Sequence, residues 1–264
     1  MLHRLPVLAF SALLLTGASA AAAPQDQPRE PVRTRITIGP QLLPSHPGAD
    51  TVSLRPFFDI SRARGGNEFE FEAPDESFGF PILRISGLEI GPALGIEGKR
   101  DADAVGAPIH KVGFSFEAGA FVQTQLTDTL RLRIDARKGL SGHRGWIGMV
   151  SADYVARDAD NWLFSIGPRV TFADDRYQRA YFGLTAADAV AANLPQFDAK
   201  GGVQSAGVAA GSLHRLSSRW GIATYARYDR LVGDAADSPV TRRLGSPNQF
   251  SVGLGVSYTF GTLP

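Results

Sequence analysis

The chain has 264 residues, with 27 Lys and Arg against 26 Asp and Glu, so it offers no basic excess to attract nucleic acid. It contains no Cys, which excludes a disulfide framework and thiol chemistry. Its 29 Gly and 17 Pro are scattered along the chain, and such punctuation favours many strands and turns over long helices.

The first segment predicts export. Residues 7–18 are apolar, Arg4 precedes them, and small residues follow as far as Ala23. This order is typical of a cleaved signal peptide, which we expect at residues 1–23. The apolar run is too short to cross a bilayer as a helix, and no later stretch approaches 18 consecutive apolar residues. Residues 24–32 are rich in Pro and charge and predict a flexible lead-in.

Apolar and polar side chains alternate along many segments of residues 33–264. From Phe250 to Phe260, every second side chain is apolar or aromatic, and those between are small or hydroxylic. Successive side chains of a strand point to opposite faces, so this pattern predicts strands with one apolar face. Several segments reach the roughly 9–11 residues of a tilted membrane strand. We therefore expect the apolar faces to meet lipid and the polar faces to line a lumen.

The expected fold is all-β, a closed antiparallel transmembrane β-barrel over residues 33–264. Bacterial single-chain barrels have even strand numbers, so we expect about 12 strands, with about 10 as the fallback. Two of thirteen candidate segments, 67–73 and 78–86, are then one broken strand, or one segment is a loop. Residues 186–193 predict a loop with a helical turn. The candidate segments are 33–43, 51–62, 67–73, 78–86, 87–98, 111–126, 129–138, 144–157, 160–172, 178–186, 200–214, 219–231 and 248–260.

Charged residues of both signs fall on the polar faces. Two interpretations stay open: a small selective pore, or an ion-pair network that fills the lumen. We favour the network, because a charge on the lipid face would cost roughly 2–4 kcal/mol at the midplane, so its inward placement needs no functional reason. The candidates to face the lumen are Glu89, Glu97, Glu117, Arg131, Arg133, Asp135, Arg137, Arg169, Arg227 and Asp229.

Aromatic residues near the ends of the candidate strands predict the interfacial girdles of such a barrel. They are Trp146, Tyr154, Trp162, Tyr181, Trp220, Tyr228 and Phe260.

We find no sequence pattern for catalysis, a cofactor or a metal. The His residues are isolated and lack the spacing of metal ligands. No G-x-S-x-G elbow is present, and Gly201-Gly202 lacks the strand–helix context of a phosphate loop. Pairs such as Ser141 with His143 are too generic to indicate an enzyme. We expect a non-enzymatic protein without cofactor or metal.

Four stretches of the chain carry a family likeness. They are residues 91–101, which begin Gly-Pro-Ala-Leu-Gly, then 163–185, 194–202 and 230–249. On these residues the chain resembles the MipA/OmpV family, the MltA-interacting proteins of Gram-negative outer membranes. Phe197 stands where the family pattern has Tyr. The matching motif residues are Tyr181, Gly183, Gly233, Asp234, Ala235, Asp237, Ser238 and Pro239.

The resemblance implies a barrel in the outer membrane, in contact with its lipid. It also implies a scaffold that links a periplasmic murein hydrolase to a murein synthase, because the founding member is regarded in that way. Other members are described as porin-like or adhesive, so a narrow channel for small solutes is the alternative. The family brings no catalytic residues. The resemblance leaves open whether residues 233–240 fold over the barrel mouth or brace a neighbouring loop.

Overall fold

The computed structural model describes residues 30–261. The predicted signal peptide, residues 1–23, and most of the predicted lead-in, residues 24–32, lie outside the described residues. The last three residues of the predicted barrel, 262–264, also lie outside them.

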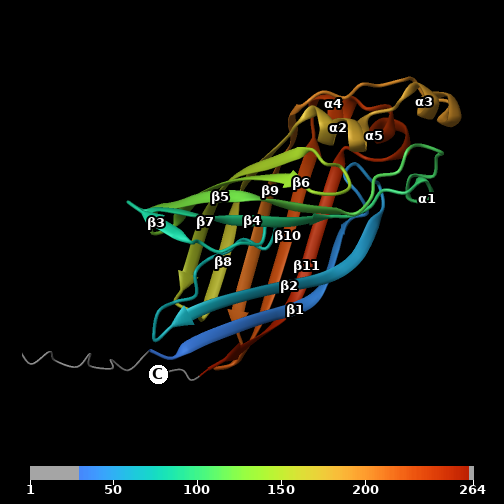
Figure 1. Ribbon diagram of the computed structural model, residues 1–264. Helices are drawn as coiled ribbons and strands as arrows, with labels where there is room; N and C mark the ends of the chain where they lie inside the picture. Colours follow the sequence, from blue (N-terminus) through green and yellow to red (C-terminus); the bar gives the residue numbers. More distant parts are fainter. Residues whose placement is uncertain (1–29, 262–264) are drawn as a thin grey trace, which may run out of the picture. The chain divides into compact units, whose positions relative to one another are not determined.

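One antiparallel sheet of eleven strands dominates the described chain (Figure 1). Its strands are β1 (Val32–Pro44), β2 (Val52–Arg64), β3 (Leu83–Ile85), β4 (Leu88–Glu97), β5 (Ser115–Thr127), β6 (Leu130–Gly139), β7 (Trp146–Asp158), β8 (Trp162–Ala173), β9 (Gly202–Arg215), β10 (Trp220–Leu231) and β11 (Asn248–Phe260). The helices are α1 (Ala102–Val105), α2 (Asp175–Phe182), α3 (Ala186–Ala192), α4 (Gly233–Asp237) and α5 (Pro239–Leu244).

The strands follow one another around the sheet in the order β2-β1-β11-β10-β9-β8-β7-β6-β5-β4-β3. The first strand thus pairs with the last, and Thr34 of β1 lies opposite Phe260 of β11. Each neighbouring pair is antiparallel, so the edge strands β2 and β3 run in the same direction. Within residues 30–261 no bridge joins β2 to β3, and the sheet is not closed.

Burial alternates along the strands in the sense opposite to a water-soluble sandwich. In β7 the buried residues include Ser151 and Asp153, while Val150 before them and Tyr154 after them are exposed. In β11 Ser257 is buried, whereas Leu254 and Val256 are exposed. The pleat sends successive side chains to opposite faces, so one face is apolar and exposed and the other is polar and buried. We call these the apolar face and the polar face.

The two ends of the sheet differ in their connections. At one end the strands are joined by short turns such as Ser86-Gly87 and Asp128-Thr129. Ser86 and Gly87 both have positive φ, the backbone of a two-residue hairpin turn. At the other end longer connections carry all five helices (Figure 1). We call these connections, residues 98–114, 140–145, 174–201 and 232–247, the cap.

Two strand predictions were wrong. Residues 178–186 were predicted as a strand, yet α2 covers most of them, because Tyr177 and Tyr181 repeat at the spacing of a helix turn and both are buried. Asp174 fixes the start of this helix, since its side chain accepts a hydrogen bond from Tyr177 N. Residues 67–73 are extended but pair with no strand. Residues 186–193, predicted as a loop with a helical turn, hold the short helix α3.

The predicted strand 78–86 is shorter than expected. Only Leu83–Ile85 form β3, while Phe78 makes an isolated bridge with Leu94 of β4. Because two of the thirteen candidate segments, 67–73 and 178–186, are not strands, the sheet has eleven strands rather than the expected twelve. The edge between β2 and β3 is open because residues 65–77, which follow β2, do not pair with a strand of the sheet.

Candidate functional site

Residues 65–77, which we call the inserted segment, cross the polar face of the sheet. Their sequence contains five acidic residues and no basic residue. Five of their carbonyl oxygens accept hydrogen bonds from strand arginines. Arg33 donates to Gly65 O and Asn67 O, Arg157 Nη1 to Phe69 O at 3.0 Å, Arg131 Nη1 to Phe71 O at 2.7 Å, and Arg133 Nη2 to Ser77 O at 3.2 Å. Arginine side chains thus provide hydrogen bonds that a neighbouring strand would otherwise make.

The aromatic side chains of the inserted segment also lie against guanidinium groups. Phe69 is buried, and the Arg35 guanidinium carbon lies 4.4 Å from the centre of its ring. Phe71 holds the Arg131 guanidinium at 4.8 Å. Such cation–π contacts are worth about 0.5–2 kcal/mol, the upper value applying where water is excluded. They fix the segment against the polar face along with its backbone hydrogen bonds.

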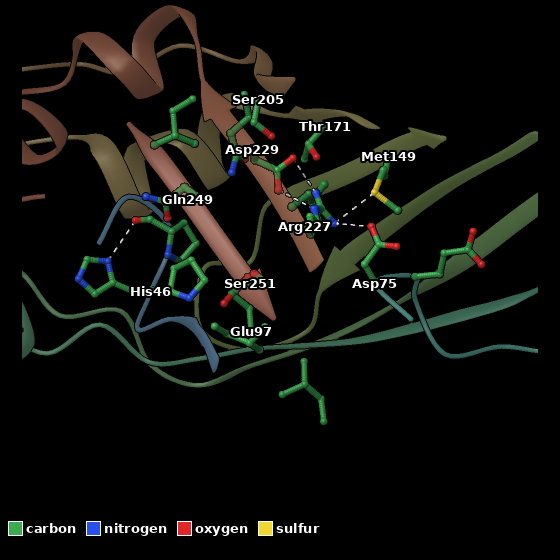
Figure 2. Close-up of a pocket in the computed structure, with 18 of the residues that line it drawn as sticks. His46, Asp75, Glu97, Met149, Thr171, Ser205, Arg227, Asp229, Gln249 and Ser251 are labelled. Atoms are coloured by element: carbon green, nitrogen blue, oxygen red, sulfur yellow. Dashed lines mark hydrogen bonds and ion pairs between the residues drawn. The ribbon is translucent and has the colours of Figure 1, made fainter. Parts of the chain in front are cut away.

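Asp75 is held by two arginines. Arg169 donates from Nε to Oδ2 at 2.8 Å and from Nη2 to Oδ1 at 3.0 Å. Arg227 Nη1 donates to Oδ2 at 3.1 Å, and Figure 2 shows this contact. The side chains of Asp75 and Arg169 are 4% and 1% exposed. A carboxylate buried this deeply requires charged partners, since its desolvation is otherwise unfavourable by several kcal/mol.

Glu76 repeats this arrangement beside Asp75. It pairs with Arg131 and lies 3.8 Å from Arg133, and all three side chains are almost fully buried. The two adjacent carboxylates of the inserted segment therefore contact four arginines from three strands: β6, β8 and β10. We call Arg131, Arg133, Arg169 and Arg227 the arginine cluster.

Further ion pairs join neighbouring strands of the polar face. Arg169 Nη2 also donates to Asp153 Oδ1 at 2.8 Å, and Arg227 Nε donates to Asp229 Oδ2 at 2.5 Å. The side chain of Glu117 is almost completely buried between Arg137, whose Nε lies 2.8 Å away, and His143, whose Nε2 lies 3.0 Å away.

All ten residues that the sequence singled out as charged lumen candidates lie on the polar face, but they do not form one site. Eight belong to the ion-pair network: Glu117, Arg131, Arg133, Asp135, Arg137, Arg169, Arg227 and Asp229. Glu89 lies at the short-turn end and pairs with Arg84 at 2.7 Å. Glu97 lies near the cap and accepts a hydrogen bond from Gly98 N at 2.9 Å.

A polar cavity of about 360 Å³ lies between the inserted segment and the cap (Figure 2). Pro74, Asp75 and Glu76 form part of its wall, and Tyr177 and Leu231 line it from the cap side. Towards the short-turn end, smaller cavities of about 60 Å³ and 20 Å³ follow on the polar face. The inserted segment thus divides the space on this face. In the described part of the chain, no three His, Asp or Glu side chains are grouped to hold a metal ion.

The motif residues pack together inside the cap. Tyr181 is fully buried, so it does not belong to the predicted girdle, and its hydroxyl donates to Gly98 O at 3.3 Å. Ser238 is fully buried and donates from Oγ to Phe182 O at 2.6 Å. Gly183, which follows α2, stands next to that carbonyl. These contacts join α2 to the start of α5.

The remaining motif residues shape α4 and α5. Gly233 has a φ of +52°, which favours glycine, and Asp234 Oδ2 accepts from Lys200 N at 2.7 Å. Ala235 is fully buried, Asp237 pairs with Arg242 at 2.5 Å, and Pro239 occupies the first turn of α5. The motif therefore braces the cap connections against one another.

Two polar side chains anchor the connection between β4 and β5 to the rest of the cap. The Arg100 guanidinium is buried and donates to Tyr181 O at 2.5 Å and His110 O at 2.7 Å. Burial lowers the pKa of Arg100 to about 10. Asp188 of α3 accepts from His110 N at 2.7 Å. Burial would raise the pKa of Asp188, but hydrogen bonds from Thr185 and His110 outweigh it and lower that pKa to about 2.

Asp75 and Glu76 are the central residues that sequence reasoning missed. Their partners lie 55 to 152 residues away in the chain, and no local spacing encodes such contacts. The available signal was the acidic run of residues 68–76, which has no basic residue to neutralise it.

Residues 36–260 match the family model of the MltA-interacting protein MipA. No protein of curated function matches the chain in sequence. Among the described residues, no helix is long and apolar enough to cross a membrane.

Solved structures offer distant likenesses. The chain is similar to the NanC porin at 12% identity, covering 87% of this chain and 98% of that chain, with a TM-score of 0.39. It is similar to an outer-membrane channel of Pseudomonas putida F1 at 10% identity, covering 90% and 100% with a TM-score of 0.37. For the N-terminal β-barrel domain of Pseudomonas aeruginosa OprF, the identity is 15%, the coverage 66% and 96%, and the TM-score 0.29.

Proposed function

The chain belongs to the MipA family of MltA-interacting proteins, and from that premise we propose that it is an exported, non-enzymatic outer-membrane β-barrel that acts as a scaffold for peptidoglycan-remodelling enzymes. Its partners in this proposal are the membrane lipid, a murein hydrolase and a murein synthase.

The apolar face carries the membrane part of the proposal. Large side chains on it are openly exposed, among them Leu54 at 72%, Ile38 at 60% and Phe250 at 61%. Soluble monomers rarely expose contiguous apolar patches larger than a few hundred Å². Lipid would cover this face, while arginines and carboxylates on the other face stay away from hydrocarbon. Unpaired backbone groups are unfavourable in hydrocarbon, so the proposal includes closure of the wall between β2 and β3.

Because its polar face is filled by side chains, the sheet favours the scaffold function rather than an open pore. The inserted segment and the paired charges occupy the space that a solute path would need. Docking surfaces are then limited to the two rims. In bacterial barrels the short turns face the periplasm, so the turn after β9 would face periplasmic enzymes. Leu216 in that turn is 60% exposed.

A capture experiment from solubilised envelopes tests the scaffold. The tagged full chain is expected to retain a murein hydrolase and a murein synthase. The variant Leu216→Asp should lose this capture, because it places a charge on the proposed docking rim. Val190→Asp is the matched control, since Val190 is 84% exposed in the cap at the opposite end. Recovery of neither enzyme by the folded wild-type chain would contradict the scaffold.

The polar cavity beside Asp75 favours a second candidate, a narrow channel for small solutes. Charged and hydroxylic side chains line this cavity, as expected for a wet passage. Planar-bilayer recordings distinguish the candidates. Regular conductance steps from the purified wild-type chain would support the channel, and their absence from correctly folded protein would reject it.

A further inference from the structure

Two carboxylates of the inserted segment neutralise charges that belong to the sheet. Asp153 and Asp229 on the strands balance two of the four arginines of the arginine cluster. Asp75 adds a further carboxylate beside Arg169 and Arg227, and Glu76 is the ion-pair partner of Arg131 and Arg133. Without the inserted segment, Arg131 and Arg133 would therefore lose their ion-pair partner on a buried surface.

The arginine cluster has the geometry of a carboxylate-binding site. Arg169 meets Asp75 through two parallel hydrogen bonds, the forked arrangement in which guanidinium groups recognise carboxylates. Arg131 and Arg133 contribute further donors, and their buried Nε atoms have no acceptor within the described residues. The donors of the cluster thus exceed what Asp75 and Glu76 use.

The inserted segment is held by arginine side chains of the strands and not by backbone pairing with a strand. No strand pairs with residues 65–77, and their carbonyls rest on arginines instead. Beside them lies the open edge, where a groove of about 770 Å³ separates β2 from Phe78 and Phe80. Glu68, Glu70 and Glu72 line this groove. The segment therefore has an adjoining space into which it can withdraw without breaking the sheet.

We propose that the arginine cluster is a binding site for a small organic dianion with two carboxylates, and that Asp75 and Glu76 occupy it as a built-in ligand. A free dicarboxylate would replace the two adjacent carboxylates one for one and leave the charge balance unchanged. This site goes beyond the scaffold proposal and shares with it only the barrel.

Chemical rescue in detergent tests the proposal on the full chain. The double variant Asp75→Ala/Glu76→Ala empties the proposed site and leaves Arg131 and Arg133 without an ion-pair partner, so its unfolding temperature should fall. Succinate should restore that temperature, whereas putrescine, a dication of similar length, and sodium chloride at equal ionic strength should not. Glu68→Ala/Glu70→Ala is the matched control. It removes two acidic side chains of the same segment that are half exposed, and succinate should not change its unfolding temperature.

The outcomes separate this proposal from the barrel itself. A folded double variant that succinate does not stabilise, or that putrescine stabilises equally, overturns the site. If the double variant fails to fold, the single variant Glu76→Ala is tested in its place. Succinate should then restore part of the lost unfolding temperature. If neither variant folds, the two carboxylates are structural and the proposal is rejected. A wild-type chain that is soluble without detergent would instead reject the barrel.

Discussion

At the scale of single residues, Arg169 is the most constrained charge of the polar face. Its guanidinium group forms ion pairs with both Asp75 and Asp153, and all three side chains are almost completely buried. Removing one partner from such a group leaves uncompensated buried charge, which is more unfavourable than the loss of the attraction alone.

We expect Arg169→Ala to lower the free energy of unfolding by about 3–5 kcal/mol, because it leaves two buried carboxylates without their shared partner. Thermal or denaturant unfolding in detergent measures the change. Arg84→Ala is the control: Arg84 pairs with Glu70 and Glu89 while 56% exposed, so its loss should amount to less than about 1 kcal/mol. Equal losses in both variants would contradict the burial argument.

Asp188 supplies a pH-dependent contact in the cap. Its pKa is about 2 in the folded chain against an ordinary value of 3.8, so its ionised form stabilises α3 above pH 4. This stabilisation is lost as the pH falls from about 4 towards 2. After correction for intrinsic exchange, amide hydrogen exchange in α3 should therefore accelerate over this range in the wild type. Asp188→Asn should remove the acid-dependent part, and an unchanged pH profile in that variant would refute the assignment.

At the scale of elements, the sequence predicts strands well where one face is apolar and exposed and the other is polar and buried. β11 was predicted at residues 248–260, and the structure has the same bounds. The alternation is sharp there because the apolar and aromatic side chains lie on one face, most of them exposed, and the small ones lie on the other. Elements outside the sheet do not follow this alternation, because their apolar side chains pack against one another. α2 was mistaken for a strand because its aromatic residues pack within the cap, and helix and strand spacing are hard to separate over eight residues.

The candidate site was predictable only in part, for the same reason. Alternation placed charged residues such as Arg131 and Arg169 on the polar face. It could not reveal what neutralises them, because their partners come from the inserted segment, 55 and 94 residues away. Those partners follow from tertiary contacts rather than from the local period.

Ser238 shows how one element depends on another. Its hydroxyl donates to Phe182 O and accepts from Val240 N, so it joins α2 to the start of α5. We expect Ser238→Ala to lower stability by about 1–3 kcal/mol, since it removes a helix cap and leaves a buried carbonyl without its donor. Proteolysis of the cap should be faster in this variant. Asp237→Ala, at a neighbouring position 58% exposed, should leave the cleavage rate close to that of the wild type.

At the scale of the whole molecule, the strand number and the inserted segment are connected. Eleven antiparallel strands leave β2 and β3 parallel at the open edge, so they cannot continue the antiparallel ladder with each other. One strand between them, antiparallel to both, would complete it with an even number. The chain between β2 and β3 has the required pattern, because Phe69, Phe71 and Ala73 alternate with three glutamates. The polar face instead holds this segment through Asp75 and Glu76.

Weakening that hold should change the transport properties. In planar bilayers we expect Asp75→Ala/Glu76→Ala to conduct at least several-fold more than the wild type, because the segment loses its ion pairs with all four arginines of the cluster. Arg131 and Arg133, left without an ion pair, should make the current anion-selective, which the reversal potential in a potassium chloride gradient measures. Glu68→Ala/Glu70→Ala removes the same number of carboxylates away from the cluster and should conduct like the wild type. A cation-selective current, or no steps from a folded double variant, would contradict a role of these two carboxylates in blocking a solute path.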